Sequence, residues 1–210
     1  LFDRLQSAIL RINKDIKPNE ISSAIKKLIE LHTPILVENN RNFHRNLVEG
    51  IDVPYKDKDG NDRFKKVYVI DFENPSNNDY LVVNQFTVIE NGKNRRPDLV
   101  IFINGIPVSV FELKSASKEE ATIFDAYKQF QTYKEQITSL FIPNAFLIIS
   151  DGVNAKIGTI TSNYERFMFW KTVDGKEINN SVMQMPTLIK GMFDKSKILD
   201  IIKLYSISVR

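Results

Sequence analysis

Two apolar segments separated by a short turn place the tightest limit on how this chain can fold. Residues 98–102 and 107–114 have the composition of strands, and Asn104-Gly105 between them is a dipeptide typical of hairpin turns. Side chains alternate between the two faces of a strand, and here both alternating sets are apolar along most of the pair. A sheet that is covered on both faces produces this pattern. The two segments therefore predict a central sheet with other elements packed on each side.

The rest of the chain divides into segments with strand or helical periodicity. We predict strands at residues 65–72, 80–89, 145–150 and 155–161, with a hairpin at Asp59-Gly60 and a turn at Asp151-Gly152. Helical spacing of apolar residues predicts helices at residues 1–16, 20–31, 34–47, 118–137 and 181–205. This order predicts an α/β fold, in which a mixed central β-sheet is flanked by helices, with N-terminal helices and a C-terminal helical extension.

Composition excludes several classes of protein. Of the 210 residues, 42% are hydrophobic and 26% are charged, which is ordinary for a globular protein with a substantial core. The absence of cysteine excludes disulfides, zinc-thiolate sites and a cysteine nucleophile. A net charge of +3 permits nucleic-acid binding without requiring it. No stretch approaches the roughly 18 apolar residues of a membrane span, so no membrane partner is expected. Because the chain starts at Leu1 and not at methionine, we expect a fragment of a longer protein.

Three charged residues, Asp98, Glu112 and Lys114, stand at the ends of the two apolar segments. Charged side chains are almost never fully buried unless they are paired. Glu112 and Lys114 are two residues apart on a strand and therefore share a face. A three-residue loop at 104–106 would place Asp98 opposite Glu112, whereas a strict two-residue turn would put the two carboxylates on opposite faces. We therefore predict an odd loop length, or a bulge that restores the same parity.

This arrangement predicts a divalent metal site. Directly opposed residues of an antiparallel pair have Cβ atoms about 4.5–5.5 Å apart, so two carboxylates there repel each other unless a cation lies between them. Mg²⁺ usually takes one or two carboxylates and keeps several waters, which can attack a phosphodiester. Asp98 and Glu112 are thus candidate metal ligands, and Lys114 would orient the water or neutralise charge on the pentacoordinate phosphorus. We take all three residues as catalytic candidates. The alternative is a surface strand end with an ion pair.

Longer stretches of the sequence resemble a known family. R-R-P-D at residues 95–98 and E-L-K at residues 112–114 match the pattern of the PD-(D/E)xK nuclease superfamily. More specific similarity lies at residues 38–45, 70–88, 94–114, 129–133, 147–159 and 165–170. These stretches resemble the N-terminal nuclease domain of the R (restriction) subunit of type I restriction enzymes, over about residues 1–205. The resemblance implies a restriction-endonuclease-like fold. In it, residues 51–175 form the nuclease core, residues 1–50 its N-terminal helical part, and residues 176–210 a helical extension leading to a missing motor domain.

The resemblance also implies a function and partners. It implies a Mg²⁺-dependent endonuclease that hydrolyses duplex DNA in the restriction of foreign DNA. Because the chain has no G-x-x-x-x-G-K-[ST] phosphate loop, ATP is expected only in the missing motor. The implied partners are duplex DNA and the methyltransferase and specificity subunits, in the cytoplasm of a bacterium or an archaeon. Two alternatives stay open: a non-catalytic DNA-binding or assembly module with the same fold, and another PD-(D/E)xK repair nuclease. The extended match argues against the second.

Four further residues are candidates for supporting the site. Gln129 and Tyr133 resemble the QxxxY motif of the family, and their spacing puts them on one helical face. We expect them to border the active site or to contact the DNA backbone, with a solvated helix face as the alternative. Arg95 and Arg96 directly precede the Pro97-Asp98 dipeptide and suit phosphate contacts, with ordinary surface charge as the alternative.

A third metal ligand is the least determined part of the site. His44 could ligate the metal, but a lone helical histidine is more often structural. Other candidates for this ligand are Glu20, Glu30 and Glu38. A basic hairpin is either solvated or faces DNA, and it contains Lys56, Lys58, Lys65 and Lys66.

Overall fold

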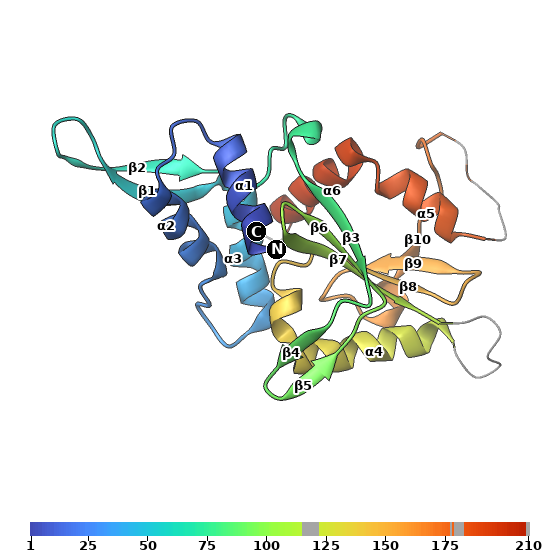
Figure 1. Ribbon diagram of the computed structural model, residues 1–210. Helices are drawn as coiled ribbons and strands as arrows, with labels where there is room; N and C mark the ends of the chain where they lie inside the picture. Colours follow the sequence, from blue (N-terminus) through green and yellow to red (C-terminus); the bar gives the residue numbers. More distant parts are fainter. Residues whose placement is uncertain (115–121, 177, 179–182, 209–210) are drawn as a thin grey trace.

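A six-stranded mixed sheet forms the centre of the computed structural model, which describes residues 1–114, 122–176, 178 and 183–208 (Figure 1). The strands lie in the order β10-β9-β8-β7-β6-β3. Their bounds are β3 Tyr80–Asn84, β6 Leu99–Ile103, β7 Ile106–Leu113, β8 Phe146–Ser150, β9 Ala155–Gly158 and β10 Met168–Phe169. The β7–β8 pair is parallel, and the other neighbouring pairs are antiparallel. The predicted mixed sheet is therefore confirmed.

Helices cover both faces of this sheet, as the two apolar alternations predict. The connection from β7 to β8 contains α4 (Ile123–Gln136) and the 3-10 helix η2 (Thr138–Phe141), which share one apolar core with Val110 of β7 and Ile149 of β8. A second core joins Phe111 of β7 and Ile148 of β8 to the remaining helices. These helices are α1 (Phe2–Ile12), α2 (Pro18–Ile29), α3 (Leu36–Glu49), α5 (Met185–Met192) and α6 (Lys195–Ser208). Both ends of the chain thus supply helices, which confirms the predicted fold class.

The turn between β6 and β7 determines which face of the sheet Asp98 reaches. It contains two residues, Asn104 and Gly105, with φ angles of 53° and 80°, and Ile103 pairs directly with Ile106. A tight hairpin turn of this kind needs positive φ at both central residues, which asparagine and glycine tolerate. The predicted three-residue loop is therefore wrong.

A bulge in β7 restores the parity that the short turn would have lost. Beyond the turn, the paired residues are Phe102 with Pro107, Ile101 with Ser109, Val100 with Val110, and Leu99 with Phe111. Val108 is the extra residue, and its carbonyl accepts a hydrogen bond from Ala145 N at 2.9 Å on the β8 side. One further step in this register brings Asp98 opposite Glu112. The bulge predicted as the second possibility is therefore confirmed.

The strand predicted at residues 80–89 is divided into two. β3 ends at Asn84, and β4 (Val88–Glu90) leaves the main sheet to pair with β5 (Lys93–Arg95). The division falls at Gln85, whose φ of 53° is left-handed and interrupts the extended backbone. Glycine and asparagine are the usual residues at positive φ, so the glutamine carries no local signal for this bend.

Most other predicted elements are present with shifted ends. β2 (Asp62–Val67) ends before the predicted limit of residue 72. α4 begins after Thr122, whose backbone N–H donates to Asp125 Oδ2 at 2.9 Å in a capping box, while residues 118–121 of the predicted helix lie outside the described residues. The helix predicted at residues 181–205 is instead α5 and α6, and its first two residues are not described. Across the described ranges, no helix is long and apolar enough to cross a membrane.

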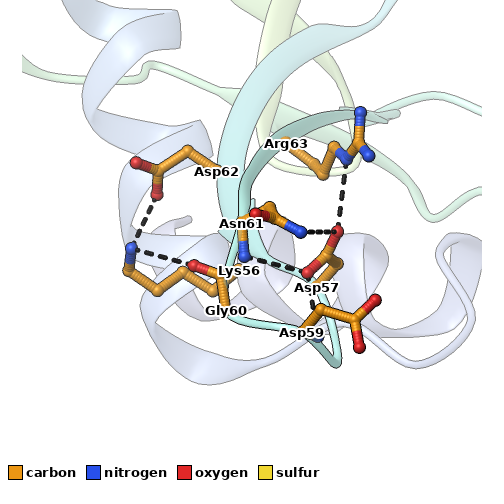
Figure 2. A network of polar contacts seen from close by, with 7 residues as sticks. All are labelled: Lys56, Asp57, Asp59, Gly60, Asn61, Asp62 and Arg63. Carbon is orange, nitrogen blue, oxygen red and sulfur yellow. Dashed lines mark hydrogen bonds and ion pairs between the residues drawn. The ribbon is translucent and has the colours of Figure 1, made fainter.

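The hairpin formed by β1 (Ile51–Lys56) and β2 extends away from the main sheet (Figure 1). Asp57 holds its tip, because Oδ1 accepts hydrogen bonds from the N–H groups of Asp59 and Asn61, and Oδ2 accepts one from Arg63 (Figure 2). The lysines of this hairpin are largely paired with carboxylates. The pairs are Lys56 with Asp62, Lys65 with Glu20, and Lys66 with Asp52. This pairing favours the solvated alternative over a DNA-facing surface.

Candidate active site

Asp98, Glu112 and Lys114 lie at one edge of the central sheet. Asp98 comes directly before β6, and Glu112 and Lys114 come at the carboxyl end of the neighbouring antiparallel β7. Lys114 N donates to Ser150 O at 2.8 Å, which continues the β7–β8 ladder past the end of β7. Lys114 Nζ donates to Glu112 Oε1 at 2.7 Å. The fold thus brings the three predicted catalytic residues to the same end of two adjacent strands.

Both carboxylate oxygens of Asp98 accept hydrogen bonds. Oδ2 accepts one from Leu113 N at 2.7 Å, and Oδ1 accepts one from Gln85 Nε2 at 2.9 Å. The first of these bonds ties Asp98 to the strand that carries Glu112. An ionised carboxylate offers about four lone-pair sites, so both oxygens retain room for a further partner.

Glu112 is the buried member of the cluster, with 5% of its surface exposed. Burial has the largest influence on its pKa and raises it, the hydrogen bond from Lys114 opposes this, and the charge of Asp98 raises it further. The hydrogen bond from Leu113 N to Asp98 Oδ2 holds the two carboxylates near each other. Within the described part of the chain, Glu112 Oε2 forms no hydrogen bond, although the side chain of Tyr133 lies close enough to Glu112 to oppose the rise in its pKa. A buried oxygen left unpaired is costly, which marks Oε2 as an open position for a ligand.

Tyr133 reaches the same cluster from α4. Its pKa is raised to about 12, first by burial and then by the charge of Glu112, with a smaller contribution from Asp98. An interaction with the side chain of Gln129, one helical turn earlier, partly opposes this rise. Tyr133 therefore lies beside the carboxylates, and Gln129 lies beside Tyr133. This geometry fits the predicted position of the QxxxY residues at the border of the site, while their contact with DNA stays a prediction.

Arg95 and Arg96 lie just before the cluster in the chain. Arg95 donates from Nε to Gln136 Oε1 of α4 at 2.6 Å and from Nη1 to Asn94 O at 3.1 Å. Arg96 is exposed. The first guanidinium is thus held against α4, and the second is open to solvent and to a phosphate. Their predicted contact with DNA is a proposal taken up below.

His44 is buried in the protein, away from the two carboxylates. It is 1% exposed, its Nε2 forms a hydrogen bond with Asn144 O at 3.2 Å, and its ring packs edge-on against Tyr205 with centroids 5.1 Å apart. Asn144 precedes β8, and Ser150 at the opposite end of β8 is the residue that bonds Lys114. These surroundings favour the structural role that the sequence analysis gave as the more common one for a lone helical histidine. The three other candidates for a third metal ligand also have surroundings of another kind. Glu20 pairs with Lys65, and Glu30 and Glu38 are exposed.

The buried histidine should make the stability of the protein depend on pH. Burial lowers the pKa of His44 from 6.5 to about 4, against opposing hydrogen bonds at Asn144 and Pro143. Between these values the unfolded chain binds a proton that the folded chain does not. Above pH 6.5 His44 is neutral in both states and does not lower the free energy of unfolding. As the pH falls from 6.5 towards 4, protonation of the unfolded chain lowers the free energy of unfolding. We expect His44 to remove about 3 kcal/mol of unfolding free energy over that range. Urea unfolding across it should show a shallower decline for His44→Gln, and parallel declines would contradict the assignment.

The two carboxylates of the site suit a divalent cation that prefers oxygen ligands. Among the described residues there is no group of three or more His, Cys, Asp or Glu side chains that could hold a metal. Mg²⁺ does not require such a group, because it usually binds through one or two carboxylates and keeps several waters. Glu112 Oε2 and the remaining lone pairs of Asp98 offer ligands of this kind. The side chains present therefore fit Mg²⁺ better than a metal that needs nitrogen or sulfur.

The sequence analysis missed two contacts of the site. Leu113 N reaches Asp98 only in the bulged register, and Gln85 reaches Asp98 only because β3 pairs with β6. Both contacts join segments whose pairing is not visible in either segment alone. A signal for Gln85 would have required knowledge of the positive φ that ends β3.

Comparisons with known proteins place the chain in a family. Residues 1–166 match the family described as type I restriction enzyme R protein N terminus. The type I restriction enzyme HindI endonuclease subunit of Haemophilus influenzae is 33% identical over 207 residues, which cover 97% of this chain and 20% of the relative. The putative type I restriction enzyme MjaIXP endonuclease subunit of Methanocaldococcus jannaschii is 31% identical over 223 residues, covering 97% of this chain and 21% of the relative.

These matches establish the family. The chain belongs to the type I restriction enzyme R protein N-terminal family, as the resemblance of its motifs predicts. It spans about a fifth of the length of the two relatives.

Proposed function

We propose that this chain is the endonuclease module of a type I restriction enzyme R subunit and that it hydrolyses phosphodiester bonds of duplex DNA with Mg²⁺. The family and the names of its relatives support this class of reaction. The observation that carries the proposal is the meeting of Asp98 and Glu112 at one sheet edge, with Lys114 bonded to Glu112. The unpaired Glu112 Oε2 supports a ligand at this edge.

The contacts of each residue suggest its role. Asp98 and Glu112 hold the cation, which when bound acidifies a water and polarises the phosphoryl oxygen. The Lys114 ammonium, 2.7 Å from Glu112 Oε1, orients the attacking water or neutralises the charge that develops on the phosphorus. Arg95 and Arg96 contact neighbouring phosphates of the backbone, for which a planar guanidinium is well suited.

Tyr133 and Gln129 of α4 form one side of the site. Because the pKa of Tyr133 is raised to about 12, its hydroxyl stays protonated at neutral pH and can donate a hydrogen bond to a carboxylate or phosphate oxygen. Gln129 interacts with Tyr133 and so helps to orient that hydroxyl. In this proposal the two residues support the reaction through the groups that they hold.

Target recognition and energy come from outside this chain in the proposal. The relatives are about five times as long as the segment that they share with it. We propose that the complete subunit carries an ATP-driven motor and that methyltransferase and specificity subunits select the DNA. The enzyme would act in the cytoplasm of a bacterium or an archaeon.

Calorimetric titration with Mn²⁺, used as a probe for the Mg²⁺ site, tests the proposal. We expect the wild-type protein to bind Mn²⁺ and Asp98→Ala to bind it at least about 100-fold more weakly, because loss of a ligand should exceed the 10–100-fold effect of losing a group that only supports a ligand. Asp59→Ala, which removes an exposed carboxylate from the β1–β2 tip, is the matched control and should bind as the wild type does.

The same titration separates the nuclease from the non-catalytic module. Absence of binding by the wild type, or equal binding by Asp98→Ala, would favour a DNA-binding or assembly module with this fold. If Asp59→Ala lost as much affinity for Mn²⁺ as Asp98→Ala, Mn²⁺ binding would depend only on the net charge of the protein.

A further inference from the structure

Gln85 contacts Asp98 twice, once through its backbone and once through its side chain. Gln85 N donates to Asp98 O at 2.9 Å, one step beyond the last β3–β6 pair, which is Asn84 with Leu99. Gln85 Nε2 donates to Asp98 Oδ1, also at 2.9 Å. Gln85 is an exposed residue, so packing in the core does not require an amide at this place.

The backbone at Gln85 is left-handed, with a φ of 53°. Only a few per cent of residues other than glycine adopt positive φ, and asparagine, aspartate and histidine are favoured among them. The neighbouring Phe86 packs edge-on against Phe102, with ring centroids 5.2 Å apart, and so anchors the chain where it turns out of the sheet. Glycine would suit this bend better than glutamine. The long amide side chain therefore needs an explanation other than backbone conformation.

We infer that Gln85 is a positioning residue for the cation site, an inference that rests on the function proposed above. The amide of Gln85 and the N–H of Leu113 each hold one oxygen of Asp98, which limits rotation of the carboxylate. Metal-binding carboxylates are commonly held by hydrogen bonds of this kind, and losing them weakens metal binding.

A neutral amide suits this position better than a charged side chain. Lysine or arginine at residue 85 would put a cation against Asp98 and compete with the metal, and a carboxylate would offer no donor and would repel Asp98. Glutamine gives one hydrogen bond and leaves the net charge of the site unchanged. The cluster already contains one ammonium group, that of Lys114, which is paired with Glu112 at 2.7 Å.

The test compares two substitutions of Gln85 with a matched control. Gln85→Gly removes the amide and relieves the left-handed backbone, whereas Gln85→Met keeps nearly the same length without an N–H donor. Asp15→Gly gives the same relief at an exposed residue with a φ of 56°, in the connection between α1 and α2. Each protein is titrated with Mn²⁺ in a calorimeter and unfolded in urea.

We expect both Gln85 substitutions to weaken Mn²⁺ binding by about tenfold, the lower end of the effect of losing a group that holds a metal ligand. Asp15→Gly should bind Mn²⁺ as the wild type does. The urea midpoint of Gln85→Gly should change by the same small amount as that of Asp15→Gly. Loss of affinity without loss of stability is the signature of a residue that positions a ligand.

Three results would overturn the inference. If either Gln85 substitution binds Mn²⁺ as tightly as the wild type while Asp98→Ala has lost binding, Gln85 has no role at the site and the proposed function stands. If Gln85→Gly loses far more stability than Asp15→Gly, the amide serves the fold. If the wild type binds no Mn²⁺, the proposed function fails and the inference fails with it.

Discussion

Replacing Glu112 by glutamine is expected to slow DNA cleavage by about 10³-fold or more in a protein that still folds. Glutamine keeps the shape of the side chain but cannot carry the negative charge that attracts the cation. A bound divalent cation contributes several kcal/mol of charge stabilisation, and each 1.4 kcal/mol corresponds to a factor of about ten in rate. Loss of most of this stabilisation gives the expected size of the effect.

The fold should tolerate this substitution because the charge of Glu112 is unfavourable in the metal-free protein. Burial raises the pKa of Glu112, and the charge of Asp98 raises it further, so the ionised form is held mainly by Lys114. An amide removes the burial cost and the repulsion but weakens the 2.7 Å ion pair with Lys114. These changes oppose each other, because the amide oxygen can still accept a hydrogen bond from Lys114, and the Lys114 side chain is 22% exposed, so water can solvate the ammonium that loses its charged partner. We expect the unfolding free energy to change by no more than about 1 kcal/mol.

Cleavage of duplex DNA by the assembled restriction complex, together with urea unfolding of the same variant, measures both effects. The matched control is Glu165→Gln, which makes the same change at an exposed residue of the 3-10 helix η3 (Tyr164–Arg166). If Glu112→Gln cleaves DNA at close to the wild-type rate, Glu112 does not bind a cation that the reaction needs.

Replacing Asn104 by alanine should lower the unfolding free energy by about 3–5 kcal/mol. Asn104 is fully buried, and its side chain binds four separate backbone or side-chain groups. Its Oδ1 accepts from Asp79 N at 2.7 Å and from Arg11 Nη2 at 3.3 Å, and its Nδ2 donates to Val69 O and Asn78 Oδ1, both at 2.8 Å. Each buried group left unpaired costs about 1–3 kcal/mol before relaxation, and alanine at a φ of 53° adds about 1 kcal/mol of backbone strain.

The turn between β4 and β5 provides the control for this prediction. Asn91-Gly92 has φ angles of 49° and 72°, close to those of Asn104-Gly105, but Asn91 is exposed and makes no side-chain hydrogen bond to a described residue. Asn91→Ala should therefore lower the free energy of unfolding only by the backbone strain of alanine at positive φ, about 1 kcal/mol. Urea or thermal unfolding of both variants decides between the explanations. Equal losses would mean that backbone conformation, and not the buried network, accounts for the effect of Asn104→Ala.

The fold class was predictable because its evidence is local. The two apolar alternations at residues 98–114 predict a sheet covered on both faces, and α4 with η2 share a core with one face while helices from both ends of the chain share a core with the other. The ends of the elements were less predictable. The strand at residues 80–89 divides at Gln85, where pairing with Asp98 stabilises a positive φ that glutamine does not favour by itself.

The candidate site was predictable to the extent that it depends on spacing within one strand. Glu112 and Lys114 share a face because they are two residues apart, whatever surrounds them. The face of Asp98 depends instead on the bulge at Val108, whose carbonyl accepts a hydrogen bond from the N–H of Ala145, the residue before β8. A short turn alone would have separated the carboxylates, so the pairing of β7 with β8 contributes to the geometry of the site.

The sequence by itself determined the apolar strand pair, the position of the turn at Asn104-Gly105 and the shared face of Glu112 and Lys114, because alternation and turn chemistry involve neighbouring residues only. The tertiary structure decided the rest. The contact of Gln85 with Asp98 spans 13 residues, and the burial of His44 against Asn144 spans 100. Such contacts depend on which strands pair and on which side chains leave water together, and no segment of the chain contains that information alone.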